Sequence, residues 1–329
     1  MIAGCNSNAQ AATTGSAALP LISIVILYYK RRETIAESIE SVLRQDYPNR
    51  EVIVVDNHSE DGLKQWLGVH GYDVKLIELP QNLGTCGGRN AGIRAARGSI
   101  VVCLEDDVSF LSAIELNKMV RVFEQHPDIH VLALKICDPD TGKLSLREWC
   151  HARSWKESAE YEFETNWFGE GASAFRREVF DTCGLYYEPL FYGVESHELI
   201  IRLMNGGCRI LYTPHVRVGH RAAPSGRTPE RQFYYYTRNY FWLAYKNHYF
   251  ANGVRFLLPK LMMMFYFAFR TGNFRPFFRG VLHGITGLRQ IRADRTRATK
   301  STERYFAEIE KYRPSLAVRL ARHRQQPQI

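Results

Sequence analysis

Three consecutive acidic residues, Glu105, Asp106 and Asp107, follow an apolar run at residues 99–104. Adjacent carboxylates repel one another, so their clustering favours a bound cation or a set of donors opposite them. Hard divalent cations such as Mg²⁺ and Mn²⁺ take oxygen ligands and commonly bridge carboxylates to substrate phosphates. The pattern therefore indicates a metal–phosphate site. The alternative is an acidic turn that caps the following helix.

Two other polar clusters also follow apolar runs. Tyr28 and Tyr29 come after the first such run, and Asp56 and Asn57 come after the second. Ligands of open α/β sheets bind at the carboxyl ends of the strands. Three polar clusters at strand ends therefore indicate one ligand site at that edge of the sheet.

A glycine-rich segment at residues 82–92 lies between the second and third clusters and contains Gly87, Gly88 and Arg89. Its glycines allow a close backbone approach, and the helix predicted to follow it would present its N-terminus to an anionic group. The segment lacks the spacing G-x-G-x-x-G and does not directly follow the first strand. This disfavours a dinucleotide-dependent dehydrogenase.

The elements that position these residues alternate between strand and helix. Apolar β-branched runs are separated by segments whose apolar residues recur at helical spacing. This alternation is typical of βαβ units, so we predict an α/β fold with a mostly parallel central sheet flanked by helices. The predicted strands cover residues 21–27, 51–55, 74–77, 99–104, 130–136 and 209–218.

Four motifs, taken in order, resemble those of the family 2 glycosyltransferases, and most of all those of its bacterial rhamnosyltransferase-like branch. They lie at residues 24–26, 54–62, 82–92 and 104–107. The resemblance covers residues 21–245. It implies a GT-A fold, in which a nucleotide-sugar half (21–110) and an acceptor half (111–228) form one catalytic domain.

The same resemblance implies an inverting hexosyltransferase of cell-surface polysaccharide synthesis. The enzyme would use a nucleotide-sugar donor, a glycan or lipid-linked acceptor, and Mg²⁺ or Mn²⁺. Tyr28, Asp56 and Asn57 would bind the nucleobase end of the donor, and Asp106 would contact the ribose. The donor nucleobase and sugar stay open, because no motif determines them.

The metal ligands implied by the resemblance are Asp107, Glu105 and His220. Asp107 would ligate the ion that bridges the diphosphate. Glu105 stands where the family usually has Asp, so its longer side chain either reaches the metal or points away. His220 follows the last predicted strand, where it would reach the metal or the diphosphate.

The catalytic base is expected where relatives carry an acidic motif, here at residues 191–202. A carboxylate there would take the proton of the acceptor hydroxyl. Ser196 replaces the usual Asp, and a serine cannot act as a base without help. We predict Glu195 as the base and Glu198 as an acceptor-binding or orienting group, since residues three apart share a helix face. His197 is a further candidate.

Two other functions stay open. One is a non-catalytic nucleotide-sugar binder or membrane scaffold, suggested by Ser196 and Glu105. The other is a sugar-phosphate nucleotidyltransferase, which also pairs a nucleotide site with acidic metal ligands. Such enzymes usually carry a glycine-rich loop after the first strand, whereas Tyr28 to Arg32 is basic and lacks glycine.

The net charge of +9 is concentrated at the C-terminal end, where residues from Arg270 onward include 14 Lys or Arg against 4 Asp or Glu. A near-neutral body argues against nucleic-acid binding. The helical aromatic and basic extension at residues 229–329 is predicted to contact an anionic membrane, or alternatively to close the acceptor half or form a homodimer.

The seven cysteines show no C-x-x-C pair, which favours free thiols in a reducing compartment. Residues 1–20 lack the pattern of a signal peptide and are predicted to be a disordered tail. We therefore predict a cytoplasmic protein, peripheral to the inner face of the plasma membrane.

Overall fold

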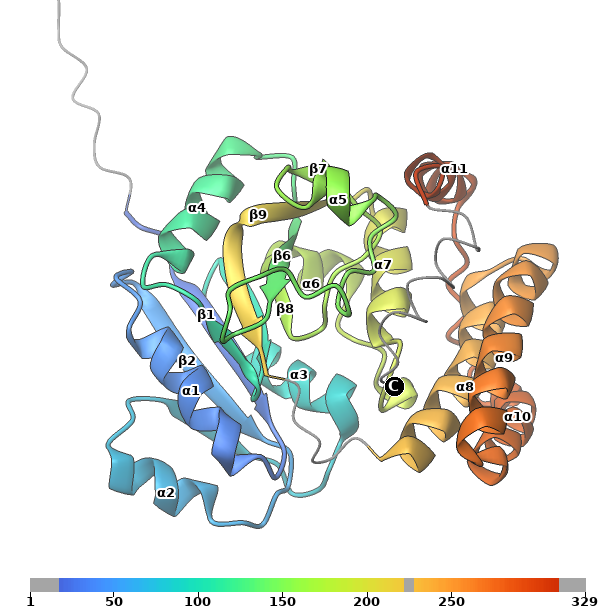
Figure 1. The fold of residues 1–329 in the computed structure, drawn as a ribbon, viewed down its shortest axis with the longest axis horizontal. Coiled ribbons are helices and arrows are strands. Elements are labelled where there is room, and N and C mark those ends of the chain that lie inside the picture. The colour runs from blue at the N-terminus through green and yellow to red at the C-terminus, as the bar shows by residue number, and fades with distance from the viewer. Residues whose placement is uncertain (1–17, 222–227, 314–329) are drawn as a thin grey trace, which may run out of the picture.

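The computed structural model describes residues 18–221 and 228–313. Most of the tail predicted at residues 1–20 therefore lies outside the described residues. All six cysteines in the described part of the chain are free, as predicted. The predicted α/β fold is confirmed: a central sheet is flanked by helices (Figure 1).

The first part of the chain forms the parallel half of the sheet. Its strands are β1 (Ile22–Tyr28), β2 (Arg50–Asp56), β3 (Lys75–Glu78) and β4 (Ile100–Glu105). Strand β1 lies between β2 and β4, and β2 also pairs with β3. Tyr28 pairs with Asp56, and Leu27 with Glu105, so the three polar clusters meet at one edge of the sheet.

The second part of the sheet contains the antiparallel pairings. Across the described residues the sheet has nine strands in the order β3-β2-β1-β4-β8-β6-β9-β5, with β7 paired to β9. Strands β8, β5 and β7 pair antiparallel with their neighbours, whereas β6 and β9 run parallel to each other. The bounds are β5 (Val108–Phe110), β6 (Val131–Cys137), β7 (Phe163–Glu164), β8 (Ala172–Arg176) and β9 (Ile210–His220).

Helices cover both faces of the sheet because its strands are apolar on both sides. On β1, Ile24 and Ile26 belong to the core that includes α1, whereas Val25 and Leu27 belong to the core that includes α3. The helices that precede the C-terminal extension are α1 (Arg32–Leu43), α2 (Leu63–His70), α3 (Gly84–Ala95), α4 (Glu115–Gln125), α5 (Trp155–Ser158), α6 (Glu178–Cys183) and α7 (Glu195–Asn205), with a 3₁₀ turn at Glu188–Leu190.

Helix α3 begins earlier than the sequence pattern indicates. The segment predicted to be a glycine-rich loop is mostly the first turns of this helix. Its glycines let the helix approach the sheet closely: a Cβ on Gly88 would lie 2.4 Å from Leu27 Cδ1, and one on Gly92 would lie 2.2 Å from Val25 Cγ1. The glycines are therefore required by helix–sheet packing.

The extension, predicted at residues 229–329, is mostly helical over its described part, residues 229–313. It consists of α8 (Pro229–Asn247), α9 (Phe250–Thr271), α10 (Phe274–Thr286), a 3₁₀ turn (Gly287–Arg289) and α11 (Lys300–Glu310). Helices α8, α9 and α10 pack on one another beside the sheet domain (Figure 1). The Asn239 amide of α8 donates to the carbonyls of Leu190, Tyr192 and Gly193, which ties the extension to the start of α7. Among the described helices, none has the length and apolar character needed to cross a bilayer.

Candidate active site

A cavity of about 710 Å³ opens at the carboxyl edge of β1 and β4 and reaches the first turns of α7 and α8. Its wall includes residues from the parallel part of the sheet, from the segments after β5 and from the extension, and many of them are charged. The charged lining residues are Arg31, Glu105, Asp106, Arg147, Glu148, Glu170, Glu195, His220 and Arg231. The polar edge predicted from the sequence is therefore part of the wall of one open cavity.

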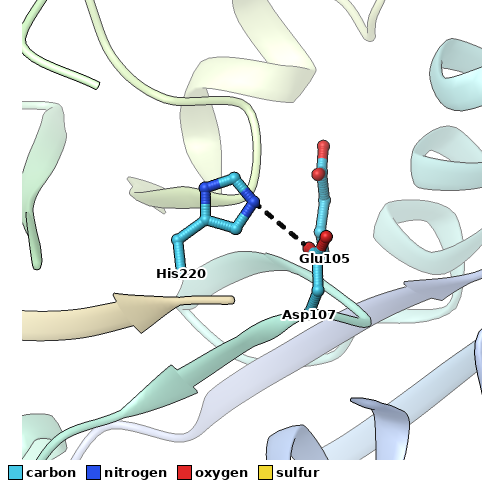
Figure 2. A group of neighbouring side chains, drawn as sticks. All are labelled: Glu105, Asp107 and His220. Carbon is cyan, nitrogen blue, oxygen red and sulfur yellow. Dashed lines mark ion pairs between the residues drawn. The ribbon is translucent and has the colours of Figure 1, made fainter. Parts of the chain in front are cut away.

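Glu105, Asp107 and His220 lie close together at this site (Figure 2). They come from the end of β4, the turn after it and the end of β9. One ligand atom from each lies within 4.8 Å of the others, and His220 Nε2 is 3.5 Å from Asp107 Oδ1. Two carboxylates and an imidazole are a donor set that Mn²⁺ or Mg²⁺ can use. The three residues predicted as metal ligands are thus brought together.

The acidic neighbours of His220 favour its protonated form. Burial disfavours the imidazolium, but hydrogen bonds and charges from Asp107 and Glu148 outweigh this and raise the pKa of His220 to about 10. The imidazole nitrogen that ligates a metal must be deprotonated. Metal binding at His220 would therefore displace this proton.

Arg31 bridges two of the acidic residues and was missed in the sequence. Its Nη1 lies 2.9 Å from Asp106 Oδ1 and 2.8 Å from Asp107 Oδ2, and the Tyr29 amide donates to Asp106 Oδ2 at 3.0 Å. Burial, together with the charges of Asp107 and Glu105, raises the pKa of Asp106 to about 7 despite Arg31. A basic residue just after the first strand was the available signal, since the acidic cluster requires a partner.

Arg89 connects Glu105, one of the three predicted metal ligands, to the candidate base Glu195. The side chain is fully buried, and its guanidinium lies 2.6 Å from Glu105 Oε1 and 3.1 Å from Glu195 Oε1. It does not line the cavity. Arg89 was predicted to contact the donor, but the structure places it behind the wall, where it pairs with two wall carboxylates. Gly87 and Gly88 likewise lie outside the wall.

The predicted nucleobase residues divide into two groups. Asn57 lines the cavity, and its amide holds the start of α3 by accepting from Leu83 N at 2.8 Å and donating to Gly84 O at 3.0 Å. Asp56 accepts from its neighbour Ser59, and Tyr28 is fully buried with its hydroxyl donated to Asp61. Neither Asp56 nor Tyr28 lines this cavity, whereas Tyr29 does.

The two predicted carboxylates at the start of α7, Glu195 and Glu198, have different surroundings. Glu195 lines the cavity and is 3% exposed; its Oε1 accepts from Thr85 Oγ1 at 2.5 Å and from Arg89. Glu198 is fully buried away from the cavity, where it pairs with Arg202 and, at 2.7 Å, with Lys246 Nζ. The structure therefore gives Glu198 a place in a buried ion-pair network and not in the cavity wall.

His197 is also unsuited to act as a base. It packs against Phe256 and does not line the cavity. Burial, aided by the charge of Lys260, lowers its pKa to about 3. Glu170, a carboxylate that was not among the predicted site residues, lines the cavity instead. Its signal was its place between two glycines just before a strand.

Residues 23–184 match the family model described as Glycosyl transferase family 2. The succinoglycan biosynthesis protein ExoO from Rhizobium meliloti (strain 1021) is 39% identical over 108 residues. That match covers 32% of this chain and 30% of ExoO, so the chain spans under a third of that relative's length. Two further curated relatives are matched over 26% and 37% of their lengths.

Solved structures share the fold at low sequence identity. The mannosyltransferase PcManGT from Pyrobaculum calidifontis, in complex with GDP-Man and Mn²⁺, has a TM-score of 0.55 at 18% identity, and the likeness covers 94% of this chain and 88% of that one. S. aureus TarS 1-349 in complex with UDP-GlcNAc has a TM-score of 0.57 at 17% identity and 83% coverage of both chains. These likenesses confirm the predicted GT-A fold.

Proposed function

We propose that this chain, which its family match and relatives support as a family 2 glycosyltransferase of polysaccharide synthesis, transfers a hexose from a nucleotide-sugar donor with inversion. The observation that carries the proposal is that Glu105 and His220, which meet Asp107, line the same cavity as Glu195. Glu105, Asp107 and His220 suit a metal-bound diphosphate. A wall carboxylate such as Glu195 suits proton removal from an acceptor hydroxyl. The proposed acceptor is a glycan or a lipid-linked glycan.

A nucleotide sugar and a divalent metal are the proposed donor and cofactor. The neighbouring structures contain UDP-GlcNAc in one case and GDP-Man with Mn²⁺ in the other. Here Asp107, Glu105 and His220 would hold Mn²⁺ or Mg²⁺, and the ion would offset the charge that develops on the departing nucleoside diphosphate. Arg31, already placed between Asp106 and Asp107, adds a fixed positive charge to the same region.

The chain's own residues account for the remaining chemistry. The acceptor hydroxyl attacks the anomeric carbon directly, so no covalent sugar–enzyme intermediate is required. Its proton passes to a carboxylate of the cavity wall, where Glu195 is the residue predicted from the sequence. Trp167, Tyr192 and Tyr236 also line the cavity and supply aromatic side chains to its wall.

The extension is proposed to contact an anionic membrane at the cytoplasmic face. Its outer surface presents large apolar side chains at helical spacing: Val254, Leu258, Met262, Tyr266 and Phe269 on α9, and Phe278, Leu282 and Ile285 on α10. Exposed Arg255, Arg270, Arg275 and Arg279 flank these side chains, and no Asp or Glu lies between Glu230 and Asp294. An apolar stripe bordered by cations is what interfacial helices use.

Vesicle co-sedimentation tests this surface. Wild type should pellet with vesicles containing phosphatidylglycerol but not with pure phosphatidylcholine, and Leu258→Glu with Leu282→Glu should abolish pelleting. Val69→Glu, at an exposed apolar residue on α2, is the matched control. A homodimer in solution that Leu258→Glu disrupts, with no vesicle binding, would assign the surface to self-association instead.

The transferase reaction is tested by release of nucleoside diphosphate from UDP-, GDP- and dTDP-sugars with MnCl₂, using detergent-extracted bacterial membranes as the acceptor source. Wild type should release nucleoside diphosphate from one donor class, and Asp107→Ala should lose this activity. The proposal fails if wild type releases none. Donor binding without release would favour a non-catalytic nucleotide-sugar binder, the function suggested by Ser196, and pyrophosphate release from a nucleoside triphosphate would favour a nucleotidyltransferase.

A further inference from the structure

Five carboxylates line the cavity in the described part of the chain, and four of them face a cation. The pairs are Glu105 with Arg89 at 2.6 Å, Asp106 with Arg31 at 2.9 Å, Glu148 with His220 at 3.3 Å, and Glu195 with Arg89 at 3.1 Å. Glu170 is the fifth, and no described Lys, Arg or His pairs with it. Within residues 18–221 and 228–313, it is therefore the wall carboxylate that has no cationic partner.

Local geometry holds Glu170 in place. It is the second residue of a turn in which the Ala172 amide donates to Gly169 O at 3.1 Å, directly before β8. The turn packs against Glu105, because a Cβ on Gly171 would lie 2.7 Å from Glu105 Cγ. A side chain at position 171 would push the turn away from Glu105, one of the predicted metal ligands. The backbone that carries Glu170 is thus fixed relative to the proposed donor site.

Glu170 also contacts the residue that replaces the expected aspartate. Its Oε1 accepts from the Ser196 amide at 3.3 Å. The neighbouring Glu195 has its Oε1 occupied by Thr85 and Arg89, and its Oε2 is buried without a hydrogen-bond partner among the described residues. Glu195 is therefore held by a hydroxyl and a guanidinium at one oxygen, whereas no described cation pairs with Glu170. The cavity wall thus offers one carboxylate better suited than Glu195 to accept a proton.

We infer that Glu170, supplied from the turn before β8, is the base that takes the proton of the acceptor hydroxyl, and that Glu195 is a positioning residue fixed by Arg89. This inference rests on the proposed transferase function. The acceptor oxygen bonds to the anomeric carbon as the bond from that carbon to the diphosphate oxygen breaks. The proton moves to Glu170, and the nucleoside diphosphate leaves with the electron pair.

The electrostatics of the wall agree with this assignment. Burial, with the charge of Glu195 next, raises the pKa of Glu170 to about 7, although Arg89 and the hydrogen bond from Ser196 oppose the shift and Glu105 adds to it. A base is most effective when its pKa lies near the working pH.

Activity measurements on isosteric variants test the role. Glu170→Gln should lower nucleoside diphosphate release by about 10²–10⁴-fold, the usual contribution of a general base. The same variant should keep the wild-type stabilisation by nucleoside diphosphate and MnCl₂, because the donor site is intact. Glu170→Asp should retain partial activity, and Glu124→Gln, at an exposed carboxylate, should match wild type. Near-wild-type release by Glu170→Gln together with loss in Glu195→Gln would overturn the assignment and make Glu195 the base.

Melting temperatures test whether the Glu170 charge lacks a cationic partner, and this test requires no enzyme activity. The folded-state pKa of Glu170 lies above its unfolded value, so its ionisation destabilises the fold as pH rises from acid to neutral. Glu170→Gln should therefore melt at a higher temperature than wild type at pH 8, with the gain shrinking toward pH 5. Glu195→Gln should melt lower at pH 8, because it leaves Arg89 with one partner. A Glu170→Gln variant no more stable than wild type at pH 8 would contradict the inference, even if the wild type proved to be no transferase.

Discussion

Replacing Arg89 with methionine tests the buried ion pairs that join Glu105, a predicted metal ligand, to Glu195. Arg89 has no exposed surface, and its guanidinium contacts Glu105 at 2.6 Å and Glu195 at 3.1 Å. Burial opposes the charge of Arg89, but the two carboxylates outweigh it and raise the pKa of the guanidinium. Methionine fills similar space but leaves both carboxylates without their cation.

The expected cost follows from that loss. Removing one partner of a buried ion pair typically costs about 3–5 kcal/mol, because the remaining charge stays buried and uncompensated. The Glu195 side chain is 4% exposed, so little solvent screening reduces this figure. We therefore expect Arg89→Met to lower the free energy of unfolding by about 3–5 kcal/mol, measured by urea denaturation at pH 7.5.

A double-mutant cycle separates this pairing from general core damage. Glu195→Gln in the Arg89→Met background should cost little further stability, since the uncompensated charge is removed. The reasoning is refuted if Arg89→Met costs less than about 1 kcal/mol, a value typical of exposed pairs, or if the two changes are additive.

Two further variants probe packing and the second ion-pair network. Gly88→Ala should destabilise the protein by about 1–3 kcal/mol, because the new Cβ would lie 2.4 Å from Leu27 Cδ1, whereas Gly68→Ala in α2, with open space around it, should be neutral or stabilising in the same urea melts. A Gly88→Ala variant as stable as Gly68→Ala would contradict the close helix–sheet contact. Glu198→Gln should cost about 3 kcal/mol by leaving Lys246 buried with a weakened partner, yet keep nucleotide binding. Loss of nucleotide binding in a folded Glu198→Gln protein would return Glu198 to the active site.

The sequence was most informative where the pattern is local. The β-branched runs before Tyr28, Asp56 and Glu105 formed adjacent parallel strands because runs apolar on both faces need cover on both sides. Their polar ends then met at one edge. His220, 113 positions after Asp107 in the sequence, was placed beside it through the family resemblance.

The sequence was less informative where contacts between distant segments determine the role of a residue. The glycines at 87 and 88 suited a phosphate loop, but the helix they belong to uses them to approach β1. Arg89 and Glu198 were predicted to be site residues because of their positions, yet both are buried in ion pairs. The turn that carries Glu170 lies beside Glu105 because β8 pairs with β4, a pairing that no short-range spacing indicates.

The most direct test of the central claim is thermal stabilisation of wild type and Asp107→Ala by UDP, GDP, dTDP and their sugars, with and without MnCl₂. A ligand that binds only the folded state raises the melting temperature. We predict a Mn²⁺-dependent shift with one nucleotide class that Asp107→Ala abolishes while its melting temperature without ligand stays measurable. No shift with any nucleotide, or an equal shift in Asp107→Ala, would contradict a metal-dependent nucleotide-sugar site at this edge of the sheet.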